Sequence, residues 1–443
     1  MSELSSAKPR TSPGTENRPR PDRRRVATVA FASWIGASIE WYDFFIYGMA
    51  AALVFPKLFF PVQDPLTSTL LSFATFGVAF VARPFGGALF GHIGDKVGRK
   101  KALVTALVTM GVTTTAIGVL PTYGSVGFIA PVLLVLLRFI QGITVGGQQG
   151  GVILLATENV PQRRRGFYGS FASAGAPGGV LLANGAFLLV TALFAGDAFL
   201  TWGWRLPFLA SVVLVAFAVV IQLRVGETAE FSSTEDRPAG RSPVLEAIRR
   251  HPRQILVAAG CYLAINLTYY VFITFVVAYA TNKAILGLPS STVLTAVLIA
   301  SAVELFALPA AGLLSDRFGR RAVFAAGALL LGLWSFVFWP LVDTGSFVLI
   351  TLALVVGLGI LHSLMYGPQG ALFSEAFSTS VRYSSLSLGI QLGSMVGGAF
   401  APFIATALLS GFGTSTAIAI YMALGCVISA ASTALLRTAE SRH

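Results

Sequence analysis

The sequence has few charged residues for its length. Only 11% of its 443 residues are Asp, Glu, Lys or Arg, and 55% are hydrophobic, whereas soluble domains carry about 25% charged residues. The mean hydropathy is +0.76. This composition excludes an ordinary soluble protein and indicates a chain surrounded mostly by lipid. Because lipid leaves no backbone group unpaired and a spanning helix needs about 20 apolar residues, the predicted fold class is an all-α membrane protein.

Several chemical signatures are also missing. The two cysteines, Cys261 and Cys426, both fall in apolar segments, so a disulfide framework is excluded. A Gly-x4-Gly-Lys-Ser/Thr phosphate loop is absent, so the chain is not expected to hydrolyse ATP. No group of residues has metal-ligand spacing, and no catalytic constellation is present. We therefore expect no metal, no cofactor and no enzymatic activity, and any active transport must draw on ion or solute gradients.

The net charge of +12 reports topology rather than a nucleic-acid partner. Most lysines and arginines lie in alternate loops or in the tails, which is the positive-inside pattern, so both termini are expected in the cytoplasm. The first apolar stretch is too long for a signal peptide and lacks a small-residue cleavage site, so it is predicted to be a retained helix. The main basic clusters lie at 8–25, 96–101, 163–165, 224–253 and 317–321.

Twelve apolar segments are predicted to cross the membrane, six on each side of a charged stretch. Residues 1–25, rich in Ser, Pro and Arg, are predicted to form a disordered cytoplasmic tail, and 438–443 a second tail. Residues 225–252 form the predicted cytoplasmic central loop between bundles at 26–224 and 253–437. The segments lie at 27–57, 66–91, 102–120, 127–157, 166–195, 203–224, 253–281, 288–314, 322–342, 345–374, 382–410 and 413–437.

Two motifs occur once in each half of the chain. The run that begins at Gly91 and contains Asp95, Gly98 and Arg99 recurs from Gly312 onward, with Asp316, Gly319 and Arg320 at the matching places. Glu158 and Arg165 have counterparts in Glu375 and Arg382, which follow them by nearly the same number of residues as separates Gly91 from Gly312. Because both motifs are separated from their repeats by nearly the same number of residues, they indicate duplication of a six-helix unit. The fold should then consist of two pseudo-symmetric bundles.

The same motifs carry a family resemblance. The Gly91–Arg99 loop resembles the signature loop of the major facilitator superfamily, whose halves are related by an axis along the membrane normal. Further segments resemble the metabolite:proton symporter family within it. They are Glu40-Trp-Tyr-Asp43-Phe44, Arg83-Pro-Phe-Gly-Gly87, Arg138-Phe-Ile-Gln141-Gly142, Arg165-Gly-Phe-Tyr-Gly-Ser170, Trp202-Gly-Trp-Arg-Leu-Pro207 and Tyr366-Gly-Pro-Gln369.

The resemblance covers nearly all of residues 26–437 and is nearest to the shikimate branch of that family. It implies the twelve-helix major facilitator fold in the cell (inner) membrane, acting as a functional monomer. Members of the family are proton-linked carriers for shikimate, α-ketoglutarate, citrate and proline/betaine. The implied partners are a small-molecule substrate, protons and the lipid bilayer, and not nucleic acid.

By the same resemblance, the repeated charged motifs form a gating latch. Ion pairs and contacts with helix ends would hold the cytoplasmic side shut at a strength of ~1–3 kcal/mol, since partly exposed pairs gain little and must reopen in each cycle. The alternative is a set of solvated turns that satisfy the positive-inside rule. The predicted latch residues are Gly91, Asp95, Gly98, Arg99, Glu158, Arg165, Asp316, Arg320, Glu375 and Arg382.

Ionisable residues inside the membrane need a function, because each costs at least ~2.5–3.5 kcal/mol at mid-bilayer. At 1.5 Å per residue, Asp43 and Arg138 fall at depths from which they can pair. In the functional interpretation Asp43 takes a proton when Arg138 is drawn away, which couples proton to solute. The alternative is a permanent salt bridge that only fixes helix packing. Glu40 is a further proton candidate, or a protonated carboxyl between packed helices.

Two carboxylates usual in the resembled family are absent. Gln148 replaces a glutamate after Gly146-Gly147, and Ile265 replaces another before Asn266. Their absence places proton coupling in question and makes the expected cavity less negative, which favours an anionic solute near Arg138. Glu304 either compensates for the lost carboxylates as a proton site or forms a local bond between helices.

The expected substrate-binding residues are polar side chains on predicted cavity faces. Each has the alternative role of bonding neighbouring helices, worth about 0.6 kcal/mol in membranes. His362 and Tyr366, four apart, support their segment as cavity-lining. The set is Arg138, Gln141, Gln148, Tyr47, Asn266, Tyr269, Tyr270, His362, Tyr366 and Gln391.

The sequence therefore favours proton-coupled symport of a small organic carboxylate or zwitterion by alternating access. An uncoupled facilitator or a proton antiporter for drugs or sugars is the first alternative. A membrane sensor or lipid-modifying enzyme is the second, although no signalling domain or catalytic constellation supports it.

Overall fold

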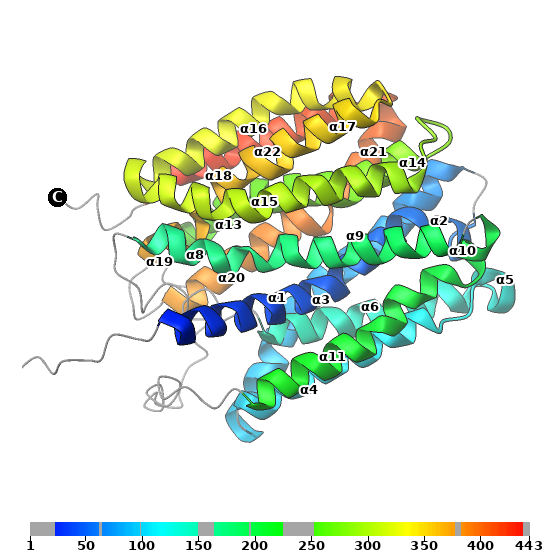
Figure 1. Cartoon of the computed structure of the whole chain (residues 1–443), viewed down its shortest axis with the longest axis horizontal. Helices are drawn as coiled ribbons and strands as arrows, with labels where there is room; N and C mark the ends of the chain where they lie inside the picture. The colour runs from blue at the N-terminus through cyan, green and yellow to red at the C-terminus, as the bar shows by residue number, and fades with distance from the viewer. Residues whose placement is uncertain are drawn as a thin grey trace, which may run out of the picture.

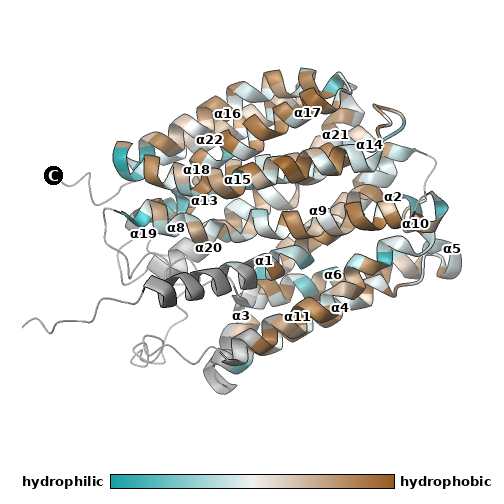
Figure 2. Ribbon diagram, in the orientation of Figure 1, coloured by the Kyte–Doolittle hydropathy of each residue, from teal (hydrophilic) through white to brown (hydrophobic). Residues whose placement is uncertain are grey.

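The computed structural model describes residues 23–61, 64–97, 99–148, 164–194, 196–224, 252–376 and 382–436. Within these ranges the chain forms helices and no strand, and the long helices run side by side in one bundle (Figure 1). Hydrophobic residues cover much of the length of the helices, and hydrophilic ones gather toward their ends (Figure 2). The predicted all-α membrane fold is confirmed.

The first half of the chain contributes six long helical units, some of them with short helices at their ends. The long units are α1 (Arg23–Leu53), α3 (Pro65–Val97), α4 (Arg99–Gly118), α6 (Ile129–Gln148), α8 (Arg165–Ser173) with α9 (Gly175–Leu193), and α11 (Leu206–Arg224). The short ones are α2 (Phe55–Leu58), α5 (Tyr123–Val126), α10 (Asp197–Thr201) and the 3₁₀ turn η2 (Gly203–Arg205).

The second half repeats this arrangement, with three of its units interrupted by π-helical turns. The units are α13 (Pro252–Tyr270) with η4 (Val271–Phe275) and α14 (Val276–Thr281); α15 (Ser290–Phe318); α16 (Arg320–Asp343); α17 (Phe347–Leu354) with η5 (Val355–His362), α18 (Ser363–Tyr366) and α19 (Gln369–Ala376); α20 (Arg382–Ser394) with η6 (Met395–Ala399) and α21 (Ala401–Phe412); and α22 (Thr416–Leu435).

The helices are long and apolar enough for a multi-pass membrane protein. In the described ranges nine meet the length and hydropathy expected of a membrane span, and two more apolar stretches, Val104–Gly118 and Gly203–Phe217, are shorter. Together with α1, they coincide with the twelve predicted segments. The prediction of helix through 149–157 falls outside the described residues.

The outer surface of the bundle is apolar. Large hydrophobic side chains such as Phe306, 77% exposed, and Val213, 71% exposed, project from it. In water such surface would cost about 25 cal/mol per Å², but against lipid tails it costs nothing comparable. The exposed face is therefore consistent with a lipid surrounding and leaves the few buried polar groups as the unusual feature.

Helix contacts in the first half recur in the second. The pairs α3–α6, α1–α9 and α4–α11 correspond to α15–η5, α13–α20 and α16–α22. Across the halves, α9 packs on α15 and α3 packs on η6 and α21, which is again one contact and its symmetric counterpart. This pattern is what two parallel copies of one six-helix unit produce, and it places the interface between the halves at the centre of the molecule.

Candidate functional site

A small cavity lies between the two halves. It is lined by residues of α1 and α9 on one side and of α13, η5 and α18 on the other. Five predicted substrate-binding residues, Asn266, Tyr269, Tyr270, His362 and Tyr366, line it. They occupy it because the cavity-facing stripe of each helix is where polar side chains avoid lipid.

Four further lining residues were not predicted from the sequence: Trp41, Ala176, Tyr262 and Ile265. A signal for Tyr262 was present, since it precedes Asn266 by four residues and Tyr269 by seven, which puts all three on one helical face. Trp41 lies within a motif that carried the family resemblance. Ala176 is an apolar side chain, and nothing in its local sequence separates it from residues that face lipid. Ile265 is also apolar, but it takes the place of a carboxylate that the family resemblance assigns to the cavity.

Arg138 on α6 lies behind the cavity in a cage of aromatic rings. Its side chain is fully buried, and its guanidinium carbon lies 4.0 Å from the ring centroid of Tyr47, 4.7 Å from that of Phe44 and 4.9 Å from that of Phe76. Such cation–π contacts contribute up to about 2 kcal/mol each when desolvated. They stabilise the charge without supplying an anion.

Only part of the guanidinium is hydrogen-bonded. Nη1 donates to Gln141 Oε1 at 3.1 Å, and Gln141 Nε2 in turn donates to Thr114 at 2.8 Å. Nε and Nη2 of Arg138 have no hydrogen-bond partner among the described residues. Since an unmade hydrogen bond of a buried charge is costly, two parallel donors are left for an anion. Gln141 positions Arg138 and does not line the cavity.

Arg83 on α3 extends this positive region toward the cavity. Its guanidinium carbon lies 4.0 Å from the Phe80 ring and 5.2 Å from the Phe44 ring, and its charge acts on Arg138. The Tyr270 ring, which lines the cavity, packs 5.7 Å from both Phe44 and Phe80. The aromatic cluster is thus the wall between the cavity and the two arginines.

Asp43 faces a different neighbour from the one expected. It is 2% exposed and accepts a hydrogen bond from Ser211 Oγ of α11 at 2.6 Å. In the described structure Asp43 forms no ion pair with Arg138, so the expected pairing is not seen. The reason is the rotation of α1: Phe44, about 100° around the helix from Asp43, is the residue turned to Arg138. The side chain of Glu40 lies outside the described part.

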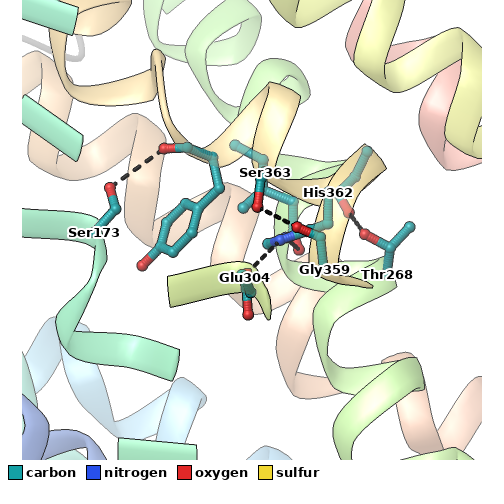
Figure 3. Close-up of polar contacts among 9 residues, drawn as sticks. Ser173, Thr268, Glu304, Gly359, His362 and Ser363 are labelled. Carbon is teal, nitrogen blue, oxygen red and sulfur yellow. Dashed lines mark hydrogen bonds and ion pairs between the residues drawn. The ribbon is translucent and has the colours of Figure 1, made fainter. Parts of the chain in front are cut away.

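In the second half, Glu304 and His362 form a buried pair (Figure 3). Both side chains are fully buried, and His362 Nδ1 lies 2.9 Å from Glu304 Oε1. The other ring nitrogen, Nε2, lies 3.1 Å from the carbonyl oxygen of Ile265. The rings of Tyr269 and Tyr366 lie 5.1 Å and 5.4 Å from the imidazole. The local interhelical bond that was one alternative for Glu304 is therefore present.

The remaining expected substrate-binding residues lie away from the cavity or outside the described part. Tyr47 bonds Thr75 at 2.6 Å beneath Arg138. Gln391, half-buried on α20, is not among the cavity-lining residues. The side chain of Gln148 is not described. In the described part of the chain, no three or more His, Cys, Asp or Glu side chains are grouped so as to suit a metal.

One member of the predicted latch joins the two halves. Asp316 at the end of α15 accepts hydrogen bonds from the backbone N–H groups of Gly166, at 2.9 Å, and Phe167, at 3.0 Å, in the first turn of α8. Its own Arg320 lies 3.5 Å away. A carboxylate at a helix N-terminus satisfies unpaired donors and complements the helix dipole. The contact therefore fastens the first half to the second.

A close backbone approach accompanies this contact. A Cβ atom added to Gly312 would lie 2.5 Å from the carbonyl oxygen of Gly166, so neither position has room for a side chain. Arg165, half-buried, begins α8. The other predicted latch residues, or their side chains, lie outside the described part: Gly91, Asp95, Gly98, Arg99, Glu158, Glu375 and Arg382.

The halves also touch at the opposite end of the bundle. A Cβ atom added to Gly48 of α1 would lie 3.1 Å from Thr274 Oγ1 of η4. The contacts at Asp316 and at Gly48 lie on opposite sides of the cavity along the bundle. The structure accordingly has its two halves in contact both above and below the cavity.

Comparison with known proteins places this geometry in a family. The profile described as Major Facilitator Superfamily matches residues 33–382 and, again, 261–443. The shikimate transporter of Escherichia coli K12 is 40% identical over 94% of this chain and 95% of its own length. An inner membrane metabolite transport protein of the same strain is 42% identical over 94% of each chain. The proline/betaine transporter of Salmonella typhimurium is 31% identical over 85% of this chain and 77% of its own.

The fold matches that of a solved transporter. The crystal structure of a D-xylose-proton symporter superposes with a TM-score of 0.70 over 91% of this chain and 96% of its own, at 18% identity. At that identity the likeness concerns the fold alone.

Proposed function

Since this chain belongs to the major facilitator superfamily and is a transporter of small organic molecules, we propose that it is a proton-coupled symporter of an organic carboxylate or zwitterion. It works by alternating access as a monomer in the cell inner membrane, with both termini in the cytoplasm. The loop distribution of Lys and Arg supports this orientation, and the name of one relative supports the inner membrane.

The observation that carries the proposal is the unfinished coordination of Arg138. Its Nε and Nη2 are buried and have no hydrogen-bond partner in the described part of the chain. These two donors have the spacing that a carboxylate accepts in a bidentate pair. A solute carboxylate that enters past Phe44 and Tyr270 would complete the shell. The rest of the solute would lie in the cavity among Asn266, Tyr269 and Tyr366.

Coupling follows from the number of charges that the first half can hold. With Arg138 bound to a solute carboxylate, Asp43 has no counter-charge from it and is neutralised by a proton. When the solute leaves and α1 turns so that Asp43, rather than Phe44, faces Arg138, the two side chains pair and the proton is expelled. Solute and proton therefore load and unload together, while the Asp316 contact opens and closes one side of the carrier.

The experiment is uptake by the purified protein in vesicles, with and without an inward proton gradient. Solutes to try first are carboxylates and betaines, in keeping with the names of the relatives. The wild type should accumulate its solute only with the gradient. Asp43→Asn should lose accumulation and retain counterflow exchange, because the carrier still moves but no longer binds the proton. Accumulation that survives intact in this variant would overturn the role of Asp43.

An uncoupled facilitator of the same fold is the second candidate. The observation in its favour is the replacement of two family carboxylates by Gln148 and Ile265. It predicts that the wild type equilibrates the solute at the same rate with and without the gradient and never concentrates it. The same vesicle measurement therefore separates the two functions.

A further inference from the structure

The Glu304–His362 pair takes no part in the coupling scheme above. Both side chains are fully buried, yet His362 also lines the cavity. The inference below rests on the proposed symport and extends it to this pair.

The hydrogen bonds fix where the protons are. A carbonyl oxygen only accepts, so the 3.1 Å contact with Ile265 requires a proton on His362 Nε2. The 2.9 Å contact between Nδ1 and Glu304 Oε1 needs one more proton, on either atom. Imidazolium with carboxylate, or imidazole with carboxylic acid, both give a pair of zero net charge. The heavy-atom geometry therefore fits the form of the pair that shares a proton.

Loss of that shared proton would break the contact. A carboxylate and the lone pair of Nδ1 would face each other at hydrogen-bond distance, and the buried site would carry a full negative charge. Two hydroxyl groups could donate hydrogen bonds to the deprotonated carboxylate of Glu304. Ser301, one turn before Glu304 on α15, and Tyr269 both have buried hydroxyls with no hydrogen-bond partner among the described residues, and Glu304 Oε2 has none there either. The deprotonated carboxylate therefore has alternative donors that the protonated form leaves unused.

Few other ionisable groups face the pair. From α13 come Tyr269 and Tyr270, and from α18 comes Tyr366; the phenols of Tyr269 and Tyr366 act electrostatically on Glu304. The segments α9 and α17 carry no ionisable residue, and α16 carries them only at its two ends. The nearest fixed charge on α15, Asp316, lies twelve residues away, or about 18 Å. Among the residues that the structure describes, no other fixed charge thus competes for the proton of the pair.

We propose that Glu304 and His362 form a second proton-binding site of the carrier. The proton passes from water in the open cavity to the Nδ1–Oε1 contact when the solute arrives, and it returns to water on the other side when the solute leaves and Glu304 turns to Tyr269 and Ser301. His362 is the last residue of the π-helical segment η5, a distortion frequently found at functional sites. The pair would supply, in the second half, a titratable group where Ile265 replaces one.

Glu304→Gln tests the proposal while keeping the packing. A glutamine amide can donate to His362 Nδ1, so the contact between α15 and η5 persists, but no proton exchanges there. The measurement is the number of protons taken up per solute, read with a pH electrode in weakly buffered vesicles. We expect this variant to keep counterflow exchange and to move one proton fewer per solute than the wild type, and Glu304→Asp to restore the wild-type ratio.

Asp343→Asn is the matched control, since Asp343 is a carboxylate at the far end of α16 that accepts hydrogen bonds from Tyr279 and Ser415. This variant should take up as many protons per solute as the wild type. An unchanged number of protons per solute in Glu304→Gln overturns the proposal. Loss of counterflow exchange in a folded Glu304→Gln variant also overturns it, because the pair would then be structural. His362→Asn, whose amide can donate to Glu304, gives the same test if the first variant does not fold. Failure of the wild type to couple at all would instead refute the proposed symport.

Discussion

At the scale of single residues, the cavity has walls of different character. Behind Phe44 and Tyr270 lie the guanidinium groups of Arg138 and Arg83. On the opposite side Tyr269 and Tyr366 cover a neutral pair, Glu304 and His362. A solute with a carboxylate at one end and hydroxyl or amine groups at the other would bind in one orientation, with its anion toward α6.

The hydroxyl of Tyr269 provides a test of this orientation. It is buried and has no partner in the described structure, so Tyr269→Phe should not lower the melting temperature. If it bonds the solute, the Kd should rise about 2- to 10-fold, the equivalent of a hydrogen bond worth about 0.5–1.5 kcal/mol. Isothermal titration with the transported solute measures the Kd, and thermal unfolding measures the melting temperature.

Tyr42→Phe is the contrasting variant, because the Tyr42 hydroxyl donates to the Pro207 carbonyl at 2.8 Å. It should lower the melting temperature and leave the Kd unchanged. An unchanged Kd in Tyr269→Phe would show that the solute does not reach this wall.

The sequence identified many residues of this site but not which of them contact one another. Polar residues in apolar segments stand out, so Asn266, Tyr269 and His362 could be named in advance. The partner of Asp43 could not, because a rotation of α1 by a fraction of a turn exchanges Arg138 for Ser211. Such rotation depends on packing against helices far away in the sequence.

At the scale of elements, the three π-helical segments η4, η5 and η6 all belong to the second half. The segment η4 directly follows Tyr270, and η5 ends at His362, so two of them adjoin cavity residues. A π turn places one residue more per turn than an α turn and leaves weaker backbone bonding, which suits a helix that bends during a cycle. The sequence predicted continuous helices here, since hydropathy does not distinguish the two forms.

The contact of Asp316 with α8 makes a prediction about the balance between conformations. Asp316→Asn removes the charge at the N-terminus of α8 and one of its two acceptor oxygens. A loss of about 1–2 kcal/mol would shift the population toward the form open at this end by about 5- to 30-fold. Distance measurements between spin labels on α8 and α15 would detect it.

Asp197→Asn is the control, because Asp197 is a carboxylate in the first turn of the exposed helix α10. This helix N-terminus is not part of the Asp316 contact between the halves. The substitution should leave the label distances unchanged. Equal distance distributions in Asp316→Asn and the wild type would show that the contact is no latch.

At the scale of the whole molecule, the cavity joins two halves whose internal contacts are repeated. A solute bound there contacts both halves at once, so it should stabilise the assembled transporter. At a solute concentration of 100 times the Kd the gain is about 2.7 kcal/mol, which raises the melting temperature. A thermal-shift screen of carboxylates, betaines, aromatic acids and sugars should therefore single out compounds with a carboxylate, and Arg138→Lys should abolish the shift.

Arg253→Lys, an exposed arginine at the start of α13, is the control for that screen and should keep the wild-type shift. A screen in which sugars stabilise the protein and carboxylates do not would remove the basis for an anionic solute.

The amino-acid sequence by itself determined the class of the protein, its twelve helical segments and its duplicated halves. Hydrophobic length and loop charge are local properties, and lipid enforces them segment by segment. Only the tertiary structure decided which buried polar groups meet: Asp43 with Ser211, Asp316 with α8, and Glu304 with His362. Each pairing joins helices distant in sequence, and its geometry depends on how the whole bundle packs.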